Sequence, residues 1–108
     1  DAIKRLQAFE EVGTDCLYAP GLRTIEEMRI VVEAVSKPVN VVMGFADPTI
    51  TLEQMAEIGV CRVSIGAGLS RVALNAMMTA AQAMKDGNFG FISDMICVGD
   101  LRKAFGEV

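Results

Sequence analysis

The fold is decided by residues 59–71, which read GVCRVSIGAGLSR. Val60, Val63 and Ile65 are β-branched and lie in a short run bounded by glycines, which favours a buried strand over a helix. The glycines after this run allow a tight turn, and Ser70 is the expected N-cap of the helix that follows. A strand, a turn and a helix in this order predict one unit of a strand-helix repeat, in which ligands bind at the carboxyl ends of the strands.

Two earlier segments repeat this order, with strands expected at residues 15–19 and 39–43. Thr24 and Thr51 are each followed three residues later by Glu or Gln, which is the capping-box pattern that opens a helix. Helices are expected at residues 2–12, 24–35, 51–58 and 70–86, and a last one near 100–105 with Asp100 as its cap. The order α-β-α-β-α-β-α-α predicts an α/β fold with three parallel strands surrounded by helices.

The composition is apolar but contains no obvious membrane span. Hydrophobic residues make up 52% of the 108, and the mean hydropathy is +0.39. No apolar run approaches the roughly 18 residues that cross a bilayer. The net charge is −4 and no basic stripe is present. We therefore expect neither a nucleic-acid nor a membrane partner.

The three cysteines, Cys16, Cys61 and Cys97, are odd in number and far apart. This pattern predicts reduced, mostly buried thiols of a cytoplasmic protein rather than a disulfide framework or a zinc site. The chain shows no signal peptide and opens directly on a helix pattern, from which we expect further residues upstream.

Three strands are few for a parallel sheet, because both of its edges would be apolar and unpaired. The preferred interpretation is that the chain forms part of a larger barrel or pairs with a partner. The alternative is a small open sheet whose edges are covered by the first helix and by the carboxyl-terminal tail.

Candidate site residues follow from the alternation of side chains along a strand. Asn40, Val42 and Gly44 share one face and should point into the barrel, because the all-apolar set on the other face would meet the helices: Val39, Val41 and Met43. The same parity turns Arg62, Ser64 and Gly66 inward and the Val and Ile between them toward helices. The predicted substrate-binding residues are thus Asn40, Gly44, Ser64 and Gly66. Asn40 and Arg62 lie at strand starts, however, and could merely satisfy buried polar partners.

Other residues have competing interpretations. The segment Gly66–Gly68 before a helix could hold a phosphate through its N–H groups. The preferred interpretation is that these glycines only allow a tight turn. Asp47 could contact a metal or substrate, but an Asp before proline is common in turns. Tyr18 is expected to pack rather than act as an acid. Because histidine is absent, Ser-His and Cys-His pairs are excluded, and we assign no catalytic and no metal-binding residue within the chain.

Six segments, in order and at suitable spacing, resemble the late part of the isocitrate lyase / phosphoenolpyruvate mutase superfamily. They are Ala2–Phe9, Val12–Asp15, Tyr18–Leu22, Lys37–Val41, Ile58–Val60 and Arg62–Gly66. The nearest branch is that of oxaloacetate decarboxylase, methylisocitrate lyase and the phosphonomutase-like proteins. The resemblance implies a (β/α)8 TIM-type barrel, of which residues 1–108 would form the carboxyl-terminal portion with strands six, seven and eight.

The resemblance also implies a chemistry. Members of the family form or break C–C or P–C bonds in small oxoacids, with Mg2+ and an enolate-type intermediate. Their acidic metal ligands and catalytic cysteine lie on earlier strands and loops, and the cysteines of this chain do not match that cysteine loop. Methylisocitrate lyases carry a substrate-binding Glu where this chain has Gly21. The chain is therefore expected to lack the main catalytic groups of an Mg2+-dependent parent enzyme.

The family's terminal helices pack on a neighbouring subunit, which predicts a homo-oligomer, a dimer or a tetramer. Residues 89–108 are the expected contact tail. Its apolar content is Phe89, Phe91, Ile92, Met95, Ile96 and Leu101. The alternative function is a non-catalytic half-barrel that self-associates, or an interaction module without chemistry.

Overall fold

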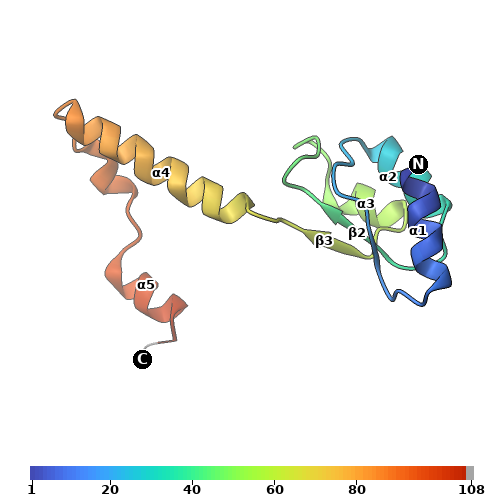
Figure 1. Ribbon diagram of the computed structural model, residues 1–108. Helices are drawn as coiled ribbons and strands as arrows, with labels where there is room; N and C mark the ends of the chain where they lie inside the picture. The colour runs from blue at the N-terminus through green and yellow to red at the C-terminus, as the bar shows by residue number, and fades with distance from the viewer. Residues whose placement is uncertain (107–108) are drawn as a thin grey trace. The chain divides into compact units, whose positions relative to one another are not determined.

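The computed structural model describes residues 1–106 and divides into two compact units, one of residues 1–69 and one that begins at Ser70. The elements follow the predicted order, with one added 3-10 helix (Figure 1). They are α1 (Ala2–Glu11), β1 (Leu17–Tyr18), α2 (Ile25–Glu33), β2 (Val39–Val42), α3 (Leu52–Glu57), β3 (Arg62–Ser64), α4 (Gly68–Lys85), η1 (Gly90–Asp94) and α5 (Val98–Ala104).

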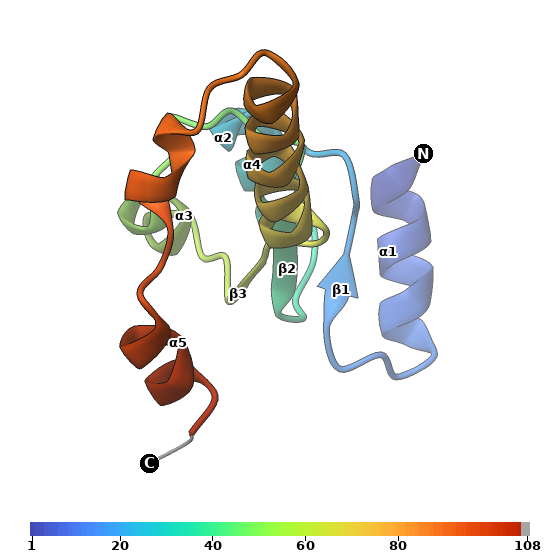
Figure 2. The same cartoon turned by 90° about the vertical axis from the view of Figure 1, so that its left-hand side faces the viewer.

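The first unit contains a sheet of three parallel strands in the order β1-β2-β3 (Figure 2). Leu17 pairs with Val39 between β1 and β2, and Asn40 pairs with Arg62 between β2 and β3. All four residues of the central strand, which pairs with a neighbour on each side, are buried. The predicted parallel α/β architecture is confirmed.

The core of the first unit lies between the sheet and helices α1, α2 and α3. It contains Leu6, Leu17, Ala19, Met28, Val31, Val39, Val41 and Met55. Val39 and Val41 alternate with Asn40, so they take the core positions and leave Asn40 for the opposite face of the sheet. Each fully buried side chain of this kind stabilises the fold by about 1.5–3 kcal/mol.

Two helices begin with the predicted capping boxes. The Thr24 hydroxyl accepts a hydrogen bond from Glu27 N at 3.2 Å, and the Glu27 carboxylate accepts one from Thr24 N at 3.2 Å. Thr51 and Gln54 make the equivalent pair at 3.3 and 2.9 Å. These bonds fix where α2 and α3 begin, and so define the loops that follow β1 and β2.

The prediction of a buried third strand is wrong. Val63 is 37% exposed and Ile65 is 47% exposed. Strand β3 lies at the edge of the sheet and pairs only with β2, and it contributes no residue to the core. Burial of an apolar strand depends on which elements cover it, and α1 to α3 pack over the core around β1 and β2.

The long helix begins at Gly68 rather than at Ser70, so Ser70 lies inside its first turn and is not its N-cap. The reason is the backbone at Gly66, whose φ of +55° reverses the chain early. Gly68 N then donates to Ile65 O at 3.0 Å, which closes the turn.

The second unit consists of most of α4 with η1 and α5, and none of its described residues is buried. Helix α5 begins at Val98 with Cys97 as its N-cap, and Cys97 Sγ accepts from Asp100 N at 3.4 Å. Asp100 is therefore in the first turn and is not the predicted cap. Within the described residues, no helix is long and apolar enough to cross a membrane.

Candidate functional site

Two of the predicted site residues meet on the face of the sheet opposite the core. Asn40 is only 5% exposed, and its Nδ2 donates to Ser64 Oγ at 3.0 Å. Ser64 Oγ in turn donates to Val41 O at 3.3 Å. The alternation of side chains predicted this shared face, because Asn40 and Ser64 lie on adjacent strands at the same parity.

Arg62 extends this contact to the first strand. Its Nε donates to Asn40 Oδ1 at 3.1 Å, and its Nη2 donates to Cys16 Sγ at 3.0 Å. We refer to Cys16, Asn40, Arg62 and Ser64 as the polar network. Its bonds leave no buried side-chain N or O atom without a partner among the described residues. Asn40 and Arg62 thus satisfy each other's hydrogen-bonding groups, which agrees with the interpretation that they serve as buried polar partners rather than substrate ligands.

Gly44 and Gly66 lie at the carboxyl ends of β2 and β3. A Cβ atom added to Gly44 would lie 3.4 Å from Ile65 O, and one added to Gly66 would lie 3.4 Å from the Val42 side chain. The positive φ at Gly66 also disfavours other residues there. An added Cβ at either position would thus contact a residue of the neighbouring chain segment at this edge, which in strand-helix barrels is the edge that binds ligands.

The segment Gly66–Gly68 is engaged in its own turn, since Gly68 N donates to Ile65 O. That amide is not directed at a ligand, which favours the turn interpretation over a phosphate site.

Asp47 closes a turn in the loop after β2. Its Oδ1 accepts from Thr49 N at 2.9 Å and from Thr49 Oγ1 at 2.7 Å. These two bonds, led by the one from the backbone, lower the pKa of Asp47 below its ordinary value. Asp47 N also donates to Arg23 O at 2.8 Å, so the loops after β1 and β2 are tied together at the carboxyl edge of the sheet. The turn interpretation explains Asp47.

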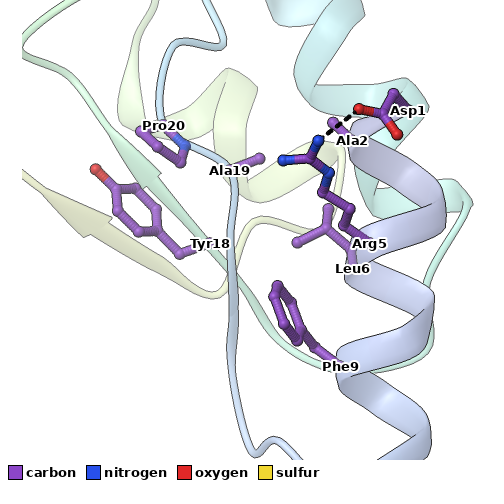
Figure 3. Close-up of a pocket in the computed structure, with 8 residues that line it drawn as sticks. All are labelled: Asp1, Ala2, Arg5, Leu6, Phe9, Tyr18, Ala19 and Pro20. Atoms are coloured by element: carbon purple, nitrogen blue, oxygen red, sulfur yellow. Dashed lines mark hydrogen bonds and ion pairs between the residues drawn. The ribbon is translucent and has the colours of Figure 1, made fainter.

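Tyr18 is 45% exposed, and its expected role in packing rather than acid catalysis stays a prediction. Leu17 takes the core position next to it, and alternation turns the Tyr18 ring to the other side of β1, away from Leu6 (Figure 3). Cys16 shares that parity, and its contact with Arg62 was not foreseen. Because Leu17 pairs with Val39 on the core face, Cys16 and Tyr18 lie on the same face of the sheet as Asn40.

A cavity of about 220 Å3 lies between α1 and β1 (Figure 3). It is lined by Asp1, Ala2, Arg5, Leu6, Phe9, Tyr18, Ala19 and Pro20. Its only charged side chains are Asp1 and Arg5, which pair with each other at 2.8 Å. With those charges neutralised and its remaining wall largely apolar, the cavity brings together no set of groups suited to acid-base chemistry.

The described residues contain no group of three or more His, Cys, Asp or Glu side chains that could hold a metal ion. The Mg2+ implied by the resemblance therefore does not fit residues 1–106 taken alone.

Comparison with known proteins identifies the family. The sequence model described as phosphoenolpyruvate phosphomutase matches residues 1–85. The chain belongs to this family. A search of curated proteins gave no match. The predicted resemblance to the isocitrate lyase / phosphoenolpyruvate mutase superfamily is thus confirmed.

Solved structures of this family extend well beyond the present chain. A protein of Burkholderia cenocepacia J2315 described as a lyase/mutase is 42% identical, with a TM-score of 0.90, and the match covers 98% of this chain and 39% of that one. A phosphonomutase described from the same organism is 37% identical, with a TM-score of 0.60 and coverage of 81% and 33%. Oxaloacetate acetylhydrolase bound to oxalate is 25% identical, with a TM-score of 0.71 and coverage of 90% and 35%. The chain therefore corresponds to part of the family's TIM-barrel-like fold.

Proposed function

We propose that the chain is the carboxyl-terminal part of an enzyme that forms or breaks a C–C or P–C bond in a small 2-oxoacid or a related carboxylate or phosphonate. The observation that supports this most strongly is the family match over residues 1–85, together with 42% identity to a protein described as a lyase/mutase. The chain spans 39% of that relative, so the activity is proposed for a longer polypeptide.

The proposed reaction passes through an enolate-type intermediate, and Mg2+ would stabilise the oxyanion that develops. The metal ligands would come from parts of the enzyme other than residues 1–106, which hold no suitable cluster. The described chain would supply the last strands of the barrel and one side of the pocket. Asn40, Gly44, Ser64 and Gly66 are the residues that we propose on the substrate side.

The test is an assay of the complete polypeptide in which this segment occurs. Oxaloacetate, 2-methylisocitrate and phosphonopyruvate form the substrate panel, each with Mg2+ and with EDTA. We expect Mg2+-dependent turnover of one of them, lost in EDTA and restored when Mg2+ is added back. A folded protein that turns over none of the three would overturn the proposal.

We further propose that the enzyme is a cytoplasmic homo-oligomer, with residues 89–108 at the subunit contact. Residues 107–108 lie outside the described residues. Five of the apolar side chains in this tail are 41–61% exposed, and they would be covered by a second copy: Phe89, Ile92, Met95, Ile96 and Leu101. All three cysteines are free, as expected in a reducing compartment. The prediction that they are mostly buried is wrong, because Cys61 and Cys97 are exposed.

Deletion of residues 89–108 tests this contact. We expect the mass in solution, measured by light scattering, to fall toward that of a single subunit. An unchanged mass would place the contact elsewhere. Self-association without turnover of any substrate would favour the second candidate function, a non-catalytic module, which the lack of a metal cluster in the described residues supports.

A further inference from the structure

The hydrogen bonds of the polar network have a defined direction, and Arg62 sets it. The oxygen and the NH2 group of an Asn side chain have almost the same shape, so neighbouring groups decide which way the amide points. A guanidinium has only donors. The Asn40 atom that lies 3.1 Å from Arg62 Nε must therefore be the oxygen, and the NH2 group must face Ser64.

The direction of the Asn40 amide then determines what Ser64 can do. Because Asn40 Nδ2 donates at 3.0 Å, Ser64 Oγ must accept there. The single hydrogen of the Ser64 hydroxyl is directed to Val41 O at 3.3 Å. A hydroxyl has one hydrogen and two lone pairs, so Ser64 retains one free lone pair and no free hydrogen.

The Arg62 guanidinium is itself held by hydrogen bonds from two of its nitrogens. Its Nε is bonded to the buried amide of Asn40, and its Nη2 is bonded to Cys16 Sγ on the far side of β2. Rotating the Asn40 amide by half a turn would place NH2 against a donor-only group at close range, which leaves both without an acceptor. The direction is therefore fixed rather than averaged.

We propose that Arg62 is a positioning residue that fixes the Asn40 amide and thereby makes Ser64 Oγ a hydrogen-bond acceptor only. Within the proposed substrate class, this point of the site favours a 2-hydroxy acid, whose hydroxyl can donate to Ser64 Oγ, over a 2-oxoacid, whose keto oxygen cannot. The ligand preference rests on the proposed function, whereas the direction of the network does not.

The network is tested by NMR on the complete polypeptide, through hydrogen exchange of the Asn40 side-chain NH2. We expect exchange to become at least about tenfold faster in Arg62→Met, because the amide is then free to rotate. Arg62→Lys should restore slow exchange, since an ammonium also only donates. The matched control is Arg29→Met, which removes an exposed arginine that pairs with Glu26 on α2. Unchanged exchange in Arg62→Met would overturn the proposal.

Ser64→Ala provides a second variant should Arg62→Met fail to fold. It removes the acceptor, so the Asn40 proton directed at Ser64 should lose its protection while Arg62 still holds the oxygen. Protection of both Asn40 protons in Ser64→Ala would also overturn the proposal.

Ligand selection is measured with lactate and pyruvate as the matched probes. We expect lactate to bind more tightly than pyruvate, and Ser64→Ala to reduce the ratio of the two affinities by about fivefold, the loss of one neutral hydrogen bond. An unchanged ratio would overturn the ligand preference while the network stands. If neither probe binds, the ligand preference fails, while turnover of the substrate panel still decides the proposed function and the NMR result still decides the role of Arg62.

Discussion

The two units of the chain differ in how far they bury their apolar residues. The unit of residues 1–69 buries eight apolar side chains in one core cluster. The unit that begins at Ser70 buries none of its described residues, although α4 carries Leu74, Met77 and Met78 with at least half of each side chain exposed. The first unit has a sheet to cover and three helices that cover it. The second has helices alone, and its apolar surface remains available for contacts that this unit does not make itself.

The largest expected effect is in the core of the first unit. Met28 is fully buried, and Met28→Ala should lower the free energy of unfolding by about 2–5 kcal/mol, because it leaves a cavity. Met78 is 68% exposed, and Met78→Ala should change it by less than about 0.5 kcal/mol. Urea denaturation of both variants measures the difference. Equal losses would break the comparison and show that a partner buries the second unit.

Glycine substitutions give the next largest effect. Gly66→Ala forces a side chain into a left-handed φ of +55°, which should cost about 1–2 kcal/mol and raise hydrogen exchange in β2 and β3. Gly87 has a φ of +76° and no neighbour near its Cβ position, so Gly87→Ala is the matched control in the second unit. We expect faster exchange there only near the end of α4. Faster exchange in β2 from Gly87→Ala would show that the two units unfold together.

Helix caps compare the units at a smaller scale. Thr24→Ala removes the hydroxyl that accepts from Glu27 N, although the bond from Thr24 N to Glu27 remains possible. It should cost about 1 kcal/mol, whereas Thr24→Ser should retain the hydroxyl bond and cost less. Cys97→Ala removes a weak sulfur acceptor and a weak thiol donor to Asp100, and it should cost less. Amide exchange in the first turns of α2 and α5 measures both. A larger loss at Cys97 would mean that the thiol has a role beyond capping.

The features predicted correctly from sequence depend on neighbours close in the chain. The capping boxes at Thr24 and Thr51 involve bonds across three residues, so the local pattern was sufficient. The shared face of Asn40 and Ser64 needed only the two-residue period of a strand. The contact of Arg62 with Cys16 joins residues 46 apart and requires the register of all three strands. The exposure of Val63 depends on what covers the sheet, which no local pattern contains.

The smallest effect that we predict is a dependence of stability on pH within the first unit. Desolvation tends to raise the pKa of Glu10, but hydrogen bonds from the backbone and side chain of Ser36 and from Lys37 N outweigh it and lower the pKa below its ordinary 4.5. Glu10 Oε1 accepts from Ser36 N at 2.7 Å and from Lys37 N at 2.8 Å, so it ties α1 to the loop before β2.

Since the folded pKa is the lower one, the carboxylate stabilises the fold fully above pH 4.5 and loses that contribution as the pH falls through the folded value. Glu10→Gln should therefore flatten the fall of the urea midpoint between about pH 6 and about pH 3. Glu11→Gln, on the exposed neighbour, should leave that fall unchanged. Because this tie lies wholly within the first unit, amide exchange in α5 should respond to neither variant. A response of α5 to Glu10→Gln would show that the unit without a core of its own depends on the unit that has one.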